Sequence, residues 1–156
     1  MKGDLLTKIE RSVEIRAPIE KVFVFLSNPK NQEKMFVDSE FKIEEISMQP
    51  DGVGTKFRIS AFMGGRKVKP HWHEFAEFEK NCKIVDQEVK GGPCKKECVT
   101  FVLGTTDKGT KLTITEDYEL PYSVLGKLVD KLAARKSFEL LVEGGTRRTK
   151  EILEAT

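Results

Sequence analysis

Both histidines of the chain and its single tryptophan lie in three consecutive residues, His71, Trp72 and His73. Side chains alternate between the two faces of a β-strand, so the imidazoles would share one face and the indole the other. Paired imidazoles at a pocket could bind a ligand or carry protons, whereas on a solvent face they would be an ordinary surface pair. The sequence does not decide which of these two faces is buried, because Phe75 shares the face of the histidines and Phe78 shares the face of the tryptophan. A β-bulge would reconcile the two frames.

A glutamate, Glu116, interrupts an apolar alternation near the end of the predicted sheet. If its face is buried, the carboxylate needs a partner or a raised pKa. His73 and an inward-pointing Arg11 are candidate partners; alternatively, Glu116 lies at the sheet end, where water reaches it. His73 and Glu116 are therefore the candidates for proton transfer. The apolar residues that share the face of Glu116 are Leu112, Ile114, Tyr118 and Leu120.

The His-x-His pair could also begin a metal site, with thiolates from Cys82, Cys94 and Cys98. Structural zinc sites usually carry close cysteine pairs such as C-x₂-C. Here Lys95, Lys96 and Glu97 separate Cys94 from Cys98, and there is no closer pair. We therefore expect no metal site and no cofactor. An odd number of cysteines is also unlike a secreted disulfide scaffold.

These residues must be positioned by a series of strands between two helical regions. Alternation over residues 8–16 predicts a first strand. Pro18 and Asn28-Pro29 then delimit two short helices, the second running to about residue 36. From residue 40 to residue 120 about six strands follow, separated by turn signals such as Asp51-Gly52 and Lys108-Gly109, as in an antiparallel meander. A shift of strand frame is expected before Ile46.

One long helix is predicted over about residues 122–155, with an apolar stripe at helical spacing. Gly144-Gly145 interrupts this stripe and either bends the helix or lets it pack closely against a neighbour. A sheet with one apolar face must cover that face, and only this helix is long enough to do so. In the predicted strand over residues 85–89, Val85, Gln87 and Val89 share one face.

Three segments resemble the SRPBCC superfamily, also called START-like or polyketide cyclase/dehydrase-like. They are residues 12–23 (SVEIRAPIEKVF), residues 77–79 (EFE) followed by a turn, and residues 109–121 (GTKLTITEDYELP) leading into a long helix. The resemblance covers nearly the whole chain and concerns structural positions. It implies an α+β helix-grip fold, in which a curved antiparallel sheet of about seven strands, with two short helices after the first, wraps around a long C-terminal helix.

Members of this superfamily bind lipids, sterols, polyketides or hormones, and a minority cyclise or dehydrate polyketides. Others assist chaperones or carry lipids and quinones. The chain departs from the family pattern at Lys80-Asn81, where prolines are common, and at Glu116, where an apolar residue is usual. The resemblance implies no family-wide catalytic motif, and fold alone does not select a function.

The bulk composition agrees with a single globular domain over residues 1–156. Apolar residues make up 38% and charged residues 33%, and the net charge is only +2. So small a net charge gives no general attraction to nucleic acid. No apolar run is long enough for a signal peptide or a membrane span, so we expect a cytoplasmic protein without stable membrane insertion.

We therefore expect a protein that binds a hydrophobic or amphipathic small molecule in an internal cavity between sheet and helix. The alternatives are a polyketide-cyclase/dehydratase-like enzyme using a cavity His or Glu, and a protein-interaction module with a filled pocket. An enzyme is the less favoured of these readings. The expected cavity residues are Phe57, Ile59, Ala61, Trp72, Phe75, Val99, Phe101, Leu112, Ile114, Glu116, Tyr118, Leu125, Leu128 and Leu132.

Overall fold

The computed structural model describes residues 6–121 and 128–155. Its order is one strand, a group of short helices, six strands and a long helix. The elements are β1 (Leu6–Ile15), α1 (Ile19–Ser27), the 3₁₀ turn η2 (Pro29–Asn31), α2 (Gln32–Met35), the 3₁₀ turn η3 (Val37–Ser39), β2 (Lys42–Ser47), β3 (Lys56–Met63), β4 (Arg66–Glu79), β5 (Lys83–Lys90), β6 (Lys96–Thr106), β7 (Gly109–Glu119) and α4 (Leu128–Glu154).

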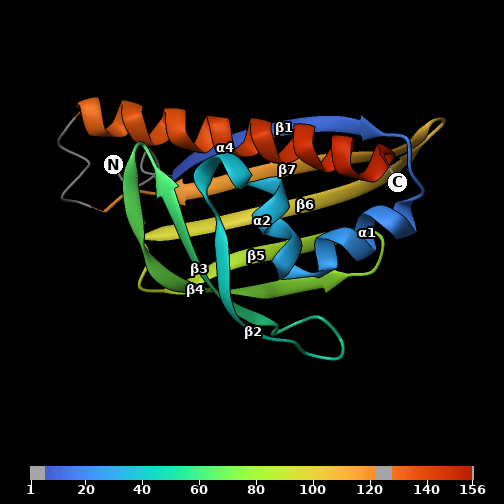
Figure 1. The fold of residues 1–156 in the computed structure, drawn as a ribbon, viewed down its shortest axis with the longest axis horizontal. Helices are drawn as coiled ribbons and strands as arrows, with labels where there is room; N and C mark the ends of the chain where they lie inside the picture. The colour runs from blue at the N-terminus through green and yellow to red at the C-terminus, as the bar shows by residue number, and fades with distance from the viewer. Residues whose placement is uncertain (1–5, 122–127, 156) are drawn as a thin grey trace.

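The strands form one seven-stranded sheet in the order β1-β7-β6-β5-β4-β3-β2, and every neighbouring pair is antiparallel. The sheet curves from β1, behind α4, round to β2 at the front of the view (Figure 1). α4 lies across the hollow of the sheet and contacts β1, β7 and α2. The predicted helix-grip architecture is therefore confirmed.

Local sequence explains where the short helices begin and end. Pro18 is the N-cap of α1 in an extended conformation, and Asn28 ends this helix. The Asn28 side chain then accepts a hydrogen bond of 3.0 Å from the backbone N–H of Lys30, and Pro29 opens η2. The expected frame shift in β2 is present as a register change between Ile43 and Glu45.

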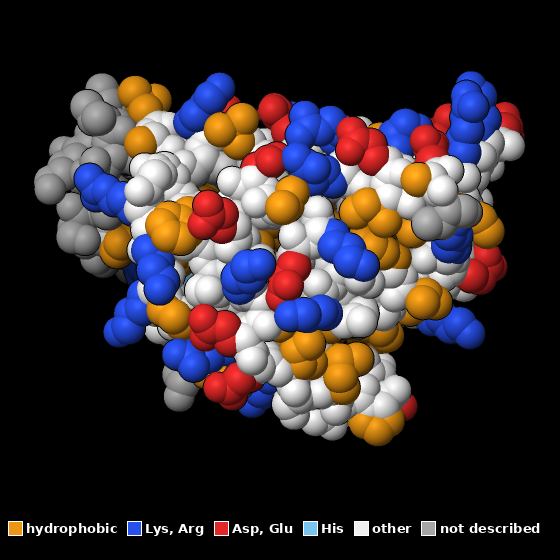
Figure 2. Space-filling view, viewed as in Figure 1, with side chains coloured by type: hydrophobic (Ala, Val, Ile, Leu, Met, Phe, Trp, Pro, Cys, Tyr) orange, Lys and Arg blue, Asp and Glu red, His pale blue; other side chains and the backbone are white. Residues whose placement is uncertain are grey.

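The two adjacent glycines of α4 do not interrupt the helix; they bring it close to α2. Gly145 is buried, and a methyl group on its Cα would lie 2.6 Å from Cε1 of Phe36. Of the two expectations for Gly144-Gly145, close packing is the one realised. Positive, negative and apolar side chains are interspersed on the face shown in Figure 2.

Candidate functional site

A row of six ionisable side chains crosses the concave face of the sheet at one end. We call it the polar row: His71 and His73 from β4, Asp86 and Glu88 from β5, Glu97 from β6 and Glu116 from β7. Strand register places them together. His73 is opposite Glu88. Val99, which lies two residues after Glu97 on β6, is opposite Asp86 on one side and Glu116 on the other. His71, His73, Asp86 and Glu116 are buried, and Glu88 and Glu97 are half-buried.

The frame of the histidine strand follows from a β-bulge. His71, His73 and Phe75 all face the interior, and the register shifts between Phe75 and Glu77. The shift also brings Phe78 inward, where its ring stacks on Phe75 with centroids 5.8 Å apart. The structure thus contains a bulge of the kind that would reconcile the two frames. Trp72 points to the opposite face and is half-buried.

The centre of the polar row is a buried pair of His73 and Asp86. Nδ1 of His73 lies 2.7 Å from Oδ1 of Asp86. The other carboxylate oxygen of Asp86 accepts a 2.9 Å hydrogen bond from Nε2 of Gln32 in α2. Burial opposes a charge on the imidazole, but Asp86, Glu97 and Glu88 outweigh it and raise the pKa of His73 to about 9.

His71 is oriented by the backbone instead of a carboxylate. Its Nδ1 lies 2.8 Å from the carbonyl oxygen of Lys69 and therefore donates a hydrogen bond to it. Its ring centroid is 5.0 Å from that of His73. Burial lowers the pKa of His71, since desolvation disfavours the imidazolium. Nε2 of each histidine is buried and accepts no hydrogen bond from the described residues.

Glu116 is fully buried, with 0% of its surface exposed. Burial, and then the negative charge of Glu97, raise the pKa of Glu116 well above its usual value. Of its two candidate partners, Arg11 does not point inward: its side chain is 43% exposed and pairs with Glu143 of α4 at 3.2 Å. The other candidate partner, His73, is hydrogen-bonded to Asp86. The alternative that Glu116 lies at the sheet end in contact with water is also wrong, because the residue is fully buried.

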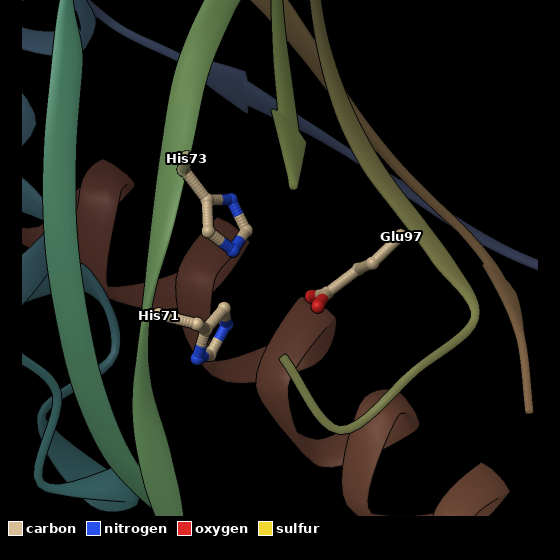
Figure 3. Close-up of side chains that lie close together, drawn as sticks. All are labelled: His71, His73 and Glu97. Carbon is tan, nitrogen blue, oxygen red and sulfur yellow. The ribbon is translucent and has the colours of Figure 1, made fainter. Parts of the chain in front are cut away.

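Sequence reasoning missed Asp86, Glu88 and Glu97. Asp86 and Glu88 share the strand face of the buried Ile84; on the other face Val85 is buried, but Val89 is 43% exposed. The signal was therefore present in the phase of Ile84. Glu97 shares the strand face of Val99, but it is the second residue of β6, where too few residues precede it for an alternating pattern to be recognised. Figure 3 shows its carboxylate directed towards the two imidazoles.

Most of the predicted cavity residues lie in one hydrophobic core beneath α4. Trp72 is half-buried on the other face and Leu132 is 59% exposed on α4, so neither is part of this core. Leu125 and the side chain of Leu128 lie outside the described residues. The core members of the predicted set are Phe57, Ile59, Ala61, Phe75, Val99, Phe101, Leu112, Ile114 and Tyr118.

A groove of about 800 Å³ lies between α4, the β3–β4 turn and η3. Its apolar lining comes from Phe62 and Met63 on the sheet side and from Ala133 and Leu140 on α4. None of the predicted cavity residues with described side chains lines it. The charged and polar residues around it are Asp38, Ser39, Glu40, Lys136, Ser137, Glu143 and Arg147.

The three cysteines are free thiols, and none is joined to another. Burial raises the pKa of Cys94, and the nearby Glu97 and Glu88 add to this effect. A thiol held in its protonated form is a poor nucleophile and a poor metal ligand. The described helices include none that is long and apolar enough to cross a membrane.

The sheet wrapped around α4 defines the class of protein, a helix-grip fold. The family match places it in the START-like (SRPBCC) superfamily. Residues 16–156 match the family described as Activator of Hsp90 ATPase homolog 1-like protein, and the chain belongs to this family. No curated protein matches the sequence.

Solved structures with this fold include several of low sequence identity. The Zhui aromatase/cyclase from Streptomyces sp. is 17% identical over 96% of this chain and 94% of its own, with a TM-score of 0.73. A START superfamily protein from Mycobacterium smegmatis is 18% identical over 93% of this chain and 98% of its own, with a TM-score of 0.69. The ginseng major latex-like protein 151 from Panax ginseng is 15% identical, covering 96% and 98%, with a TM-score of 0.67. The TM-scores show that the fold is shared, and at identities this low the comparison shows the fold alone.

Proposed function

We propose that this protein binds an amphipathic small molecule in the groove between α4, the β3–β4 turn and η3. The observation that carries the proposal is the groove itself. Its volume of about 800 Å³ lies within the range of roughly 300–1,000 Å³ typical of small-molecule sites. Membership of a superfamily whose fold typically binds hydrophobic ligands supports the same conclusion.

The lining of the groove suits a ligand with an apolar body and a polar head. Phe62 and Leu140 expose 41% and 57% of their surfaces on facing sides, and covering them is favourable by about 25 cal/mol per Å² of apolar surface. On the rim, Asp38 forms ion pairs with Arg147 at 3.6 Å and Arg148 at 2.8 Å. These pairs connect η3 to α4 beside the opening. The deeper cavity between sheet and helix remains a prediction.

Two leucines on α4 provide a matched test. Leu140 lines the groove, whereas Leu132 does not, and their exposures are nearly equal at 57% and 59%. We expect Leu140→Asp to weaken binding of a fluorescent fatty acid at least tenfold, because it places a charge on the apolar floor. Leu132→Asp should bind as the unaltered protein does. Equal affinity in both variants, or no saturable fluorescence change in the unaltered protein, would contradict the proposal.

A second candidate function, acid–base catalysis on a polyketide-like substrate, is favoured by one observation. His73 is held by Asp86 through Nδ1, which leaves Nε2 as the proton-carrying atom, and Glu116 is an acid with a raised pKa. A helix-grip relative is an aromatase/cyclase. This candidate predicts turnover of a poly-β-ketone thioester that His73→Gln abolishes while fatty-acid binding remains. Turnover that is absent, or that survives the substitution, would exclude it.

A further inference from the structure

We propose that His71, His73 and Glu97 form a binding site for one divalent transition-metal ion, with zinc the best fit. The potential ligand atoms of these three side chains all lie within 4.8 Å of one another. They come from two strands, β4 and β6, and converge on the same point of the concave face (Figure 3). This inference is independent of the groove and of the small molecule proposed for it.

The tautomers of the histidines carry the argument. Nδ1 of His73 is bound to the Asp86 carboxylate and Nδ1 of His71 to the Lys69 carbonyl. Hydrogen bonds of this kind fix the proton on Nδ1 and orient the ring in metal sites, so that Nε2 is the atom that binds the ion, in place of any proton it carries. Both histidines thus have the outer partner that a metal-binding imidazole requires.

The atoms left over by these hydrogen bonds are without partners. Nε2 of His71 and Nε2 of His73 are buried and make no hydrogen bond with the described residues. The two side chains are 3% and 2% exposed. Leaving two such nitrogens unsatisfied costs about 1–3 kcal/mol each. A bound cation satisfies both with one group.

Charge also favours a cation at this position. Asp86, Glu88, Glu97 and Glu116 bring four carboxyl groups to the polar row, against two imidazoles. The Glu116 carboxyl group lies against Glu97, to whose side chain it is hydrogen-bonded. A divalent ion at this point would be surrounded by these carboxyl groups and attracted by those that are ionised.

The ligand set selects the class of metal. Two imidazole nitrogens and one carboxylate are typical of zinc sites with an open fourth position, whereas magnesium and calcium prefer oxygen ligands throughout. Zinc–ligand bonds of about 2.1 Å require neighbouring ligand atoms to be roughly 3.4 Å apart. Binding would draw the ligand atoms together from their present spacing, within 4.8 Å, and Glu97, half-buried at the start of β6, is the least buried of the three side chains.

The turn between β5 and β6 covers this site. A methyl group on Gly92 would lie 2.9 Å from Cδ2 of His71 and would overlap the Glu88 carboxylate. The backbone of this turn therefore passes directly over the His71 side of the site. A metal held there is shielded from solvent, which strengthens its interaction with the charged ligands.

Metal binding is tested on protein stripped with a chelator. We expect one equivalent of Zn²⁺ after equilibrium dialysis, measured by elemental analysis, and a rise in the melting temperature on its addition. Glu97→Gln, which is nearly isosteric, and His71→Gln should each weaken Zn²⁺ at least tenfold in competition with a chromophoric chelator. Asp86→Asn should weaken it 10–100-fold, as loss of an outer partner typically does. Cys94→Ser should leave it unchanged.

Co²⁺ gives a readout that needs no substitution. Its visible absorption should show bands of a four- or five-coordinate nitrogen and oxygen site, without the near-ultraviolet band of a thiolate ligand. Absence of stoichiometric Zn²⁺ binding would overturn the proposal. Zn²⁺ binding that survives both Glu97→Gln and His71→Gln would equally overturn it, because the ion would then be held by other residues. A thiolate band with Co²⁺ would overturn it for the same reason.

Discussion

His73 and Asp86 form a fully buried hydrogen-bonded pair, with 2.7 Å between Nδ1 and the carboxylate. They lie on neighbouring strands, and Gln32 joins the same carboxylate to α2. The short helices are thereby tied to the middle of the sheet by polar contacts as well as by apolar packing. A pair of this kind is sensitive to the loss of either partner, because the remaining group is left buried and unsatisfied.

The first prediction concerns the stability that Asp86 provides. Asp86→Ala leaves His73 and Gln32 without their acceptor, and we expect it to lower the free energy of unfolding by about 3 kcal/mol or more. A matched control is Glu77→Ala, which removes the exposed 2.8 Å ion pair with Lys83 on the same two strands. That change should cost about 1 kcal/mol or less. Urea denaturation measures both, and similar losses in the two variants would show that the buried pair contributes little.

The second prediction concerns histidine titration, which NMR can follow directly because the chain has two histidines. In metal-free protein, His73 should titrate at about 9 and His71 below its ordinary value of 6.5. A pKa raised on folding stabilises the folded state fully below pH 6.5. This contribution is then lost as the pH rises through about 9. In Asp86→Ala, the pKa of His73 should fall, because the main group that opposes the effect of burial is removed while Glu97 and Glu88 remain; an unchanged value would contradict the assignment of its cause.

The third prediction uses the buried acid Glu116. Its pKa lies well above the ordinary value of 4.5 in the folded protein. Between the two pKa values the folded protein keeps a proton that the unfolded chain loses, so the unaltered protein loses stability as the pH rises. Glu116→Gln removes this dependence. The stability advantage of the variant should grow by up to about 1.4 kcal/mol per pH unit above pH 4.5, measured by chemical denaturation with chelator present. A constant difference between the two proteins across this range would mean that Glu116 ionises normally.

Glu116→Leu separates a structural from a ligand-binding role. If the carboxyl group contacts the ligand, fatty-acid binding should depend on pH in the unaltered protein and lose this dependence in both Glu116→Leu and Glu116→Gln. If Glu116→Leu is neutral or stabilising and binding is unchanged, Glu116 is not a site residue. The fluorescence titration used for the groove measures this at several pH values.

The fold could be predicted from the sequence because alternation and turn residues specify each strand locally. The candidate site could be predicted only in part. His71, His73 and Glu116 stood out because each breaks an apolar pattern, but their neighbours in space depend on strand register. The bulge after Phe75 sets this register, and alternation within one strand does not reveal which residue lies opposite on the next. Asp86 and Glu97 could therefore be assigned to the site only from the structure.

The fourth prediction compares the adjacent glycines of α4. A methyl group on Gly144 would meet only Oδ2 of Asp38, at 3.6 Å, so Gly144→Ala should stabilise the protein by up to about 1 kcal/mol through its higher helix propensity. Gly145→Ala would place the methyl group 2.6 Å from Phe36, whose ring is held against Phe41 with centroids 5.2 Å apart. We expect a net loss of about 1 kcal/mol or more from overpacking. Thermal denaturation should move the two melting temperatures in opposite directions; a shift in the same direction would show that α4 can move away from α2.

The pairing of β1 with β7 determines when the sheet can be completed. β1 precedes all the other described elements, yet its only neighbour in the sheet is the last strand to be synthesised. Contacts between strands so distant in sequence form late, because the closure entropy of the intervening chain must be overcome first. During translation, β1 has no partner and the outer edge of β6 is open until β7 emerges from the ribosome. A pause in synthesis before Thr110 therefore exposes two unpaired strand edges to other nascent chains, a state in which edge-to-edge aggregation competes with folding.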